Sequence, residues 1–154
     1  MKKILAKLLA VMLVLTALAP SAALADSQME KGRITIVFSH DMHSHLEKFP
    51  KFRTVIKEQK KKNDATFVLD AGDFSMGTPY QAIFKKEASE LRLMGAAGFD
   101  VTTLGNHEFD YRSAGLTAML NRAASVSAKS KTKLPQMVIA NIDWESTLAD
   151  PELK

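Results

Sequence analysis

Short apolar or β-branched runs alternate along this chain with longer amphipathic stretches, and this alternation constrains the fold more than any other feature. Strands are predicted over 33–38, 65–69, 101–104 and 137–140, and helices over 49–62, from Thr78 to about 95–98, and from Ser113 to the Lys/Ser-rich connection 127–135. Neighbouring parallel strands need crossover connections of this length, which are usually helical. The sequence therefore predicts an α/β fold of β-α-β units with a mostly parallel sheet.

The predicted helices carry start signals and apolar faces of their own. Pro50 lies in the first turn of the first helix, Thr78 and Gln81 flank Pro79 as a capping pattern, and Ser113 is the predicted cap of the third helix. The positions expected to face the core are Phe52, Val55, Ile56 and Gln59, then Tyr80, Ile83, Phe84, Ala88, Leu91 and Met94, then Leu116, Met119, Leu120 and Ala123.

Polar side chains follow each of the first three predicted strands. Asp41 and His43 follow the first, Asp73 the second, and Asn106 and His107 the third. Because ligands of parallel sheets bind beyond the carboxyl ends of the strands, we expect these side chains to converge there. Carboxylate, imidazole and amide donors together suit Mn²⁺, Zn²⁺ or Fe better than Ca²⁺. Asp73 follows a glycine and offers two oxygens, so it could bridge two ions.

The segment 105–110 holds an amide, an imidazole and two carboxylates. Asn106 and His107 are expected on opposite sides of a backbone turn, so that one holds metal while the other faces substrate. Asp110 lies close enough to accept a hydrogen bond from His107, as in a catalytic pair that protonates a leaving oxygen or stabilises phosphoryl charge. The alternatives are an ordinary strand-to-helix turn and, for the histidine-rich loop 40–45, a metal-scavenging segment.

Two further carboxylates close to these clusters are given other roles. Asp70 is assigned a structural or orienting role rather than that of a ligand, and Glu108 a structural one.

The first 25 residues have the pattern of a secretory signal peptide. Lys2, Lys3 and Lys7 precede the apolar run 8–19, and the small-residue pattern ending at Ala25 predicts cleavage there. The run is too short to span a bilayer, and the alternative is an uncleaved N-terminal anchor. The expected organisation is a signal peptide over 1–25 and a domain over 26–154. The mature protein is expected in the periplasm, on the cell wall or outside the cell, without a membrane span.

Removal of this leader changes the charge of the chain. All 17 acidic residues lie after position 25, as do 18 of the 21 basic residues, so the net charge falls from +4 to about +1. This balance gives no reason to expect a nucleic-acid partner. The chain has no cysteine, so an exported domain of this sequence is expected to be held by its core, by metal or by missing sequence rather than by disulfides.

Three motifs, in this order, resemble those of the calcineurin-like metallophosphoesterases. They are Asp41-x-His43, Gly72-Asp73 with Gly77 four residues later, and Gly105-Asn106-His107-Glu108. The longer matches, 69–73, 105–110 and 140–142, look like the exported 5′-nucleotidase branch. The resemblance implies the N-terminal part of a four-layer α/β/β/α domain that converts a nucleotide to a nucleoside and phosphate through two divalent ions.

The resemblance also implies a role for each matching residue. Asp41 and His43 would bind the first ion, Asp73 would bridge, and Asn106 would bind the second. His107 and Asp110 would form the catalytic pair, with Asn106 and His107 also contacting the small-molecule phosphoester.

The sequence departs from that family in one respect. The family supplies three later histidine ligands, whereas the histidines here are His40, His43, His45 and His107. The domain that binds base and ribose in 5′-nucleotidases is also missing, so the chain looks like a truncated front part. Cyclic nucleotides and sugar nucleotides remain alternative substrates, and the alternative function is a non-catalytic metal-binding remnant or scavenger.

Overall fold

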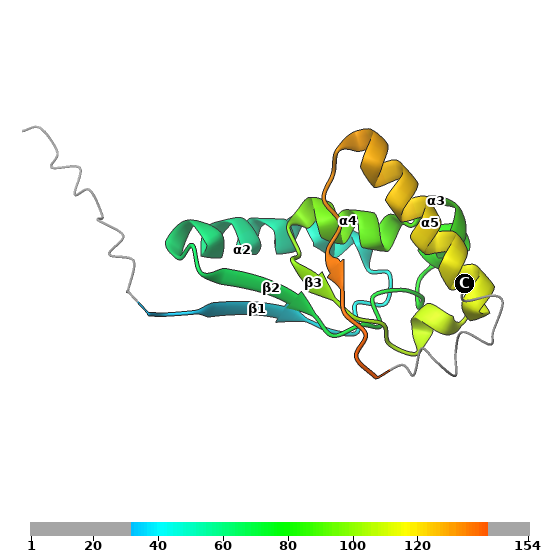
Figure 1. Ribbon diagram of the computed structural model, residues 1–154, viewed down its shortest axis with the longest axis horizontal. Helices are drawn as coiled ribbons and strands as arrows, with labels where there is room; N and C mark the ends of the chain where they lie inside the picture. The colour runs from blue at the N-terminus through cyan, green and yellow to red at the C-terminus, as the bar shows by residue number, and fades with distance from the viewer. Residues whose placement is uncertain (1–31, 142–154) are drawn as a thin grey trace, which may run out of the picture.

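The computed structural model describes residues 32–141 and contains a parallel sheet of four strands in chain order (Figure 1). The strands are β1 Thr35–Ser39, β2 Thr66–Asp70, β3 Val101–Thr102 and β4 Gln136–Met137. The register sets Ser39 beside Asp70, so β1 and β2 end at the same level. The predicted α/β fold with a parallel sheet is confirmed. The predicted signal peptide lies outside the described residues.

Helices connect the strands and lie along one face of the sheet in Figure 1. They are α2 Phe49–Lys62, α3 Phe84–Glu87, α4 Ser89–Ala97 and α5 Arg112–Ser130, with 3₁₀ turns η1 Leu46–Lys48, η2 Pro79–Ile83 and η3 His107–Phe109. The bounds of α2 agree with its prediction. No helix within 32–141 is long and apolar enough to cross a membrane.

The core fills the space between the helices and the covered face of the sheet. Its most deeply buried apolar side chains are Ile56, Val68, Phe74, Phe84, Met94 and Met119. On α5 the predicted inward positions Leu116, Met119 and Ala123 are buried, and Leu120 is partly buried. On α2 the prediction for Val55 is wrong, because this side chain is 45% exposed.

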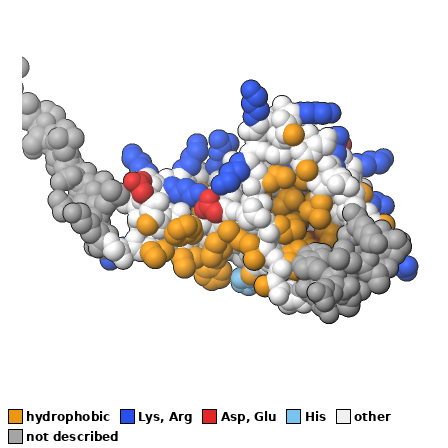
Figure 2. Space-filling model, viewed as in Figure 1, with side chains coloured by type: hydrophobic (Ala, Val, Ile, Leu, Met, Phe, Trp, Pro, Cys, Tyr) orange, Lys and Arg blue, Asp and Glu red, His pale blue; other side chains and the backbone are white. Residues whose placement is uncertain are grey.

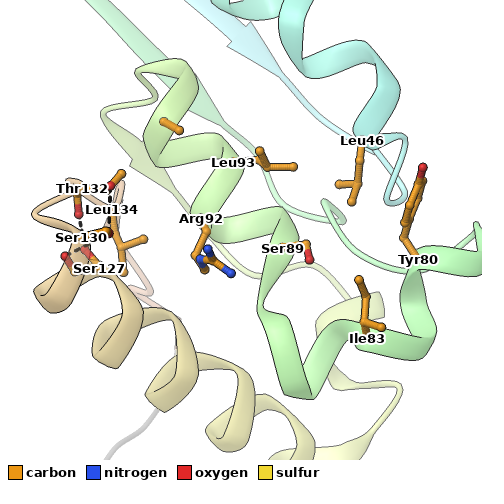
Figure 3. Close-up of a pocket in the computed structure, with 11 residues that line it drawn as sticks. Leu46, Tyr80, Ile83, Ser89, Arg92, Leu93, Ser127, Ser130, Thr132 and Leu134 are labelled. Carbon is orange, nitrogen blue, oxygen red and sulfur yellow. Dashed lines mark hydrogen bonds between the residues drawn. The ribbon is translucent and has the colours of Figure 1, made fainter.

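The continuous helix predicted from Thr78 is also wrong. Thr78 does cap the segment, since its hydroxyl accepts a hydrogen bond from the Tyr80 N–H, but the turn that follows is 3₁₀. Ala88 then adopts a left-handed conformation with φ of 48°, which separates α3 from α4. Tyr80 and Ile83 consequently miss the core and line a cavity of about 420 Å³ beside α4 (Figure 3).

Smaller differences concern the ends of elements. Ser113 lies inside α5 instead of capping it, because the helix already begins at Arg112. β3 ends at Thr102, two residues before the predicted end. β4 begins at Gln136, one residue before the predicted start, and ends at Met137, three residues before the predicted end at position 140.

The other face of the sheet exposes apolar side chains. Ile34 just before β1 is 66% exposed, and Ile36 and Phe38 within β1 are 58 and 68% exposed. Phe67 on β2 and Val138 just after β4 are each half exposed. We call these five residues the open sheet face; Figure 2 shows hydrophobic side chains gathered over the strands. Purely parallel sheets are normally covered on both faces, so a face of this kind favours association.

We therefore expect the chain to self-associate through the open sheet face. Replacing both Ile36 and Phe38 by Lys should shift the mass measured by light scattering toward the 17.0 kDa monomer, since charge opposes burial of this face. The control is Val55→Lys, which charges an exposed apolar position on α2. Equal association of the double variant and the control would contradict the prediction.

Candidate metal centre

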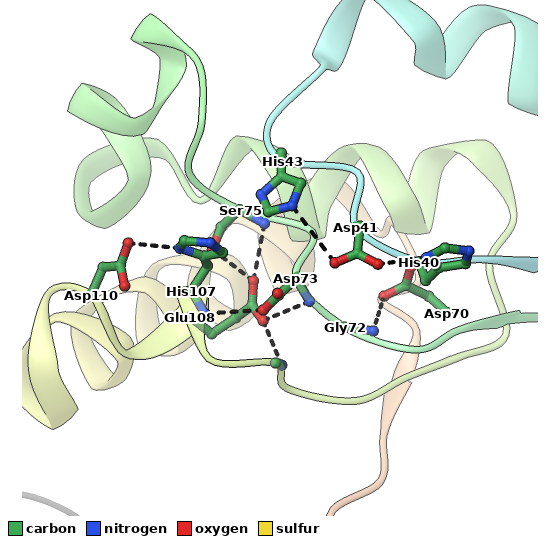
Figure 4. Close-up of polar contacts among 11 residues, drawn as sticks. His40, Asp41, His43, Asp70, Gly72, Asp73, Ser75, His107, Glu108 and Asp110 are labelled. Atoms are coloured by element: carbon green, nitrogen blue, oxygen red, sulfur yellow. Dashed lines mark hydrogen bonds and ion pairs between the residues drawn. The ribbon is translucent and has the colours of Figure 1, made fainter.

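Three loops meet beyond the carboxyl ends of β1, β2 and β3 (Figure 4). They bring together His43, Asp73 and His107, whose donor atoms all lie within 4.8 Å of one another. The three side chains are half-buried, and within 32–141 no other three histidine or acidic side chains bring their donor atoms this close together. Two imidazoles and a carboxylate are donors that Zn²⁺ and Mn²⁺ accept, so the residues present fit a divalent metal.

Asp41 lies at the edge of this cluster. Its Oδ1 is 3.6 Å from Nε2 of His43, and its Oδ2 is 2.5 Å from Nδ1 of His40. The hydrogen bond with His40 is the main reason that the pKa of Asp41 lies below its usual value. His40, which matched no ligand position in the sequence, therefore contacts a predicted ligand.

The first two loops run side by side in an unusual backbone conformation. Asp41, His43 and Asp73 have φ of 50, 45 and 52°, in the left-handed region that non-glycine residues rarely adopt. Backbone hydrogen bonds of 2.9–3.1 Å join the N–H groups of Asp41, His43 and Ser44 to the carbonyls of Gly72, Asp73 and Phe74. Strain of this kind is typical of functional sites, where surrounding contacts hold it in place.

Glu108 connects the second and third loops. Its fully buried carboxylate accepts hydrogen bonds from the N–H groups of Asp73 (3.0 Å), Ser75 (3.0 Å) and Gly105 (2.7 Å), and from the Ser75 hydroxyl (2.6 Å). Glu108 was assigned a structural role from the sequence, but its contact with the Asp73 loop was not predicted. The sequence signal for a role of Glu108 was its position directly after His107 in the glycine-containing segment 105–108.

Asp70, the last residue of β2, also connects neighbouring segments through hydrogen bonds. Its buried carboxylate accepts hydrogen bonds from the hydroxyls of Ser39 (2.7 Å) and Thr102 (2.8 Å) and from the Gly72 N–H (3.1 Å). Burial raises the pKa of Asp70 above its usual value. Because these partners come from the ends of β1 and β3 and from the loop after β2, Asp70 joins all three.

His107 lies between Asp110 and the cluster. Its Nδ1 is 2.9 Å from Oδ2 of Asp110, and this hydrogen bond is the main reason that the pKa of His107 is raised. Its backbone N–H donates to Oδ1 of Asp73 (3.0 Å), and its ring meets that of His43 edge-on at 4.9 Å. The Nδ1 contact leaves Nε2 for a metal ion or a substrate.

Comparison with known proteins settles the family. Residues 34–149 match the model of the calcineurin-like phosphoesterases. The chain belongs to this family. It is 35% identical over 114 residues to a probable 5′-nucleotidase of Treponema pallidum, covering 62% of this chain and 19% of that protein. It is 31% identical over 126 residues to the trifunctional nucleotide phosphoesterase YfkN of Bacillus subtilis, covering 79% of this chain and 8% of that protein.

The structure of the Haemophilus influenzae NAD nucleotidase is also similar. It has a TM-score of 0.53 and 31% sequence identity, over 58% of this chain and 19% of that one. The chain thus spans about a fifth or less of the length of these relatives. Calcineurin-like phosphoesterases use divalent metals, and His43, Asp73 and His107 form a possible site for one in this chain.

Asn106 is placed next to this centre without a contact that fixes its role. It precedes η3, its side chain is exposed, and its carbonyl accepts a hydrogen bond from the Phe109 N–H (3.1 Å). Its roles as a metal ligand and substrate contact in this phosphoesterase remain predictions, as do the roles of Asp41 and of the His107–Asp110 pair.

Gly105 provides a test of how tightly the centre is packed. A Cβ atom at this position would overlap Oδ1 of Asp73 and lie 2.6 Å from the Asp73 backbone nitrogen. We expect Gly105→Ala to displace Asp73, weaken Mn²⁺ binding at least about 10-fold and destabilise the fold by about 1–3 kcal/mol. Isothermal titration and thermal unfolding measure the two effects.

The matched control for Gly105→Ala is Ala124→Ser, which adds one heavy atom at an exposed position of α5. It should change neither quantity. If Gly105→Ala bound Mn²⁺ as tightly as the unaltered chain, Asp73 would not be held where the structure places it.

Proposed function

We propose that the loops beyond β1, β2 and β3 form a two-metal centre that hydrolyses a phosphoester, with a 5′-nucleotide as the substrate class. The observation that carries this proposal is the convergence of His43, Asp73 and His107 within 4.8 Å in a calcineurin-like phosphoesterase chain. Nucleotides are supported by the relatives, which include a probable 5′-nucleotidase, a nucleotide phosphoesterase and a NAD nucleotidase.

In this proposal Asp41, His43 and Asp73 hold the first ion, and Asp73 and Asn106 hold the second. The ions are of the Mn²⁺, Zn²⁺ or Fe class. When bound, they supply Lewis acidity and a bound water of lowered pKa. Glu108 fixes the Asp73 backbone through the 3.0 Å hydrogen bond, which leaves the Asp73 carboxylate positioned between the loops. Asn106 contributes an exposed amide beside His107, available to metal and substrate alike.

The His107–Asp110 pair is proposed to serve the leaving group. Asp110 holds the imidazole through Nδ1, so Nε2 is the atom from which His107 donates a hydrogen bond or a proton to the leaving oxygen. A donor fixed in this way needs no reorientation during the reaction, which is the property that makes electrostatic stabilisation effective.

The experiment is a metal titration combined with an assay of hydrolysis. The purified chain is titrated with Mn²⁺ or Zn²⁺, and the nucleoside or nucleoside monophosphate formed from AMP, a cyclic nucleotide and a sugar nucleotide is measured by chromatography, together with phosphate release from AMP and with Asp73→Asn as the reference. Saturable metal binding with metal-dependent release of phosphate from AMP supports the proposal. Absence of metal binding, or hydrolysis that Asp73→Asn leaves unchanged, contradicts it.

A second candidate function is metal binding without hydrolysis. The observation in its favour is the small donor set: the described residues place three histidine and aspartate donors together, with Asp41 and Asn106 beside them. Few of these side chains would remain to hold a second ion once the first is bound. Tight binding of a single ion together with no hydrolysis of any of the three substrates would favour this function.

We also propose that residues 1–25 are a Sec-type signal peptide and that the mature protein is exported, which their charge and apolar pattern support. Cleavage is expected between Ala25 and Asp26. N-terminal sequencing of the exported product checks this, with Ala25→Arg as a variant that should block processing. A product that begins at Met1 would contradict it.

A further inference from the structure

A third buried carboxylate, Glu90, lies close to the loop that carries His43 and has no part in the proposed function. Glu90 is in the first turn of α4 and is fully buried. Its Oε1 accepts a hydrogen bond of 2.7 Å from the hydroxyl of Ser44, which is also fully buried. Its Oε2 is buried without a hydrogen-bond partner among the described residues. Burying such a group is unfavourable, and burial accordingly raises the pKa of Glu90.

Ser44 connects this carboxyl group to the metal centre. Ser44 follows His43 directly, and both are left-handed, with φ of 54 and 45°. Two consecutive non-glycine residues in this region are disfavoured, so other contacts must hold them.

Every polar group of Ser44 bonds to another segment of the chain, and its carbonyl also accepts a local hydrogen bond from the Leu46 N–H (2.8 Å). The N–H donates to the Phe74 carbonyl (2.9 Å), the carbonyl accepts from the Thr78 hydroxyl (2.9 Å), and the hydroxyl donates to Glu90. The first two partners belong to the loop after β2, whereas Glu90 belongs to a helix of the core. Leu91 and Met94, which lie on α4 together with Glu90, are also buried. Among the hydrogen bonds of Ser44, the bond to Glu90 is therefore the one that reaches a core helix.

We propose that Glu90 is a positioning residue for metal binding, acting through Ser44 to hold the His43 imidazole beside Asp73 and His107. The proposal rests on the metal centre of the proposed function. Without the Glu90 bond, the remaining hydrogen-bond partners of Ser44 would be the loop after β2 and the Leu46 N–H, and neither lies on α4. Partners that orient metal ligands in this way typically affect metal affinity by about 10–100-fold.

The test compares Mn²⁺ dissociation constants of the whole chain and its variants by isothermal titration, well below their unfolding temperatures. Glu90→Leu removes the acceptor, and Ser44→Ala removes the donor of the same bond. Each should weaken Mn²⁺ binding about 10-fold or more. Glu90→Gln keeps an oxygen that can accept from Ser44 and should stay within about threefold of the unaltered chain. The double variant Glu90→Leu, Ser44→Ala should be no weaker than the worse single variant, since both remove one interaction.

The control is Thr66→Val, which removes another buried hydroxyl that bonds to the Asn63 carbonyl at the opposite end of β2. It should lower the unfolding temperature and leave Mn²⁺ binding unchanged. If Ser44→Ala and Glu90→Leu behave in the same way as this control, the role of Glu90 is only structural and the inference is overturned.

Two further outcomes are distinguishable. If Glu90→Leu does not fold, Ser44→Ala and Glu90→Gln decide the question. Weak Mn²⁺ binding by Ser44→Ala with normal binding by Glu90→Gln supports the inference. Equal Mn²⁺ binding by these two variants overturns it. If the unaltered chain itself binds no Mn²⁺ or Zn²⁺, the proposed function fails, and the inference that depends on it fails for that separate reason.

Discussion

Replacing Asp73 by Asn is expected to remove metal binding and phosphoester hydrolysis together. Asp73 is the carboxylate of the three-donor cluster, and in the proposed centre it serves both ions, so its loss affects each of them. Partners that only orient a ligand are worth about 10–100-fold in metal affinity, so loss of the ligand itself should exceed about 100-fold. Titration with Mn²⁺ and phosphate release from AMP measure the two effects on the same preparation.

The substitution is nearly isosteric, which allows the fold to be separated from the chemistry. The asparagine oxygen can still accept the hydrogen bond from the His107 N–H that Oδ1 of Asp73 accepts now, and the Asp73 N–H bond to Glu108 is unaffected. The unfolding temperature should therefore change little. Asp64→Asn, at an exposed loop position, is the matched control and should keep full metal affinity. An Asp73→Asn chain with normal metal content would exclude Asp73 as a ligand.

The overall fold was predictable from the sequence because its information is local. The helix α2 has proline in its first turn, a lysine run in its last turn, and buried Ile56 facing the core, and its bounds agree with the prediction. Alternation of strands and helices then leaves little choice except a parallel sheet. The edge at which the polar side chains gather follows from this topology, because the carboxyl ends of parallel strands meet there.

The break between α3 and α4 could not be predicted in the same way. Alanine has the highest helix propensity of any residue, so nothing local at position 88 indicates a left-handed residue. The conformation is compatible with tertiary packing, in which Phe84 and Ala88 are both fully buried and the direction of the chain changes between them. Tertiary contacts override propensity here, and Tyr80 and Ile83 are exposed as a consequence.

Some features of the candidate site were likewise predictable from the sequence, and others were not. The convergence of His43, Asp73 and His107 and the approach of Asp110 to His107 follow from where the strands end and from sequence spacing. The hydrogen bonds of Glu108 to the Asp73 loop and of Glu90 to Ser44 span 35 and 46 residues, respectively. They depend on left-handed loop conformations that residue types alone do not specify, so the supporting carboxylates were beyond sequence analysis.

Replacing His107 by Ala is expected to slow phosphate release by about 10²–10⁴-fold, the range for loss of a group that transfers a proton. Metal content should stay close to that of the unaltered chain if His107 acts on the leaving oxygen. Its Nδ1 is already engaged by Asp110, and His43 and Asp73 remain to hold an ion, so removal of the imidazole need not release metal. Rates of phosphate release at saturating AMP and bound Mn²⁺ per chain are measured together.

Asp110→Asn is the matched variant that separates the two roles open to His107. It leaves the imidazole in place but weakens the contact that orients it at 2.9 Å, so it should slow hydrolysis less than His107→Ala and leave metal content unchanged. The position of His107 within the three-donor cluster makes the opposite outcome equally informative. If His107→Ala lost metal as completely as Asp73→Asn, His107 would be a ligand, and Asp110 would act by orienting a ligand rather than a proton donor.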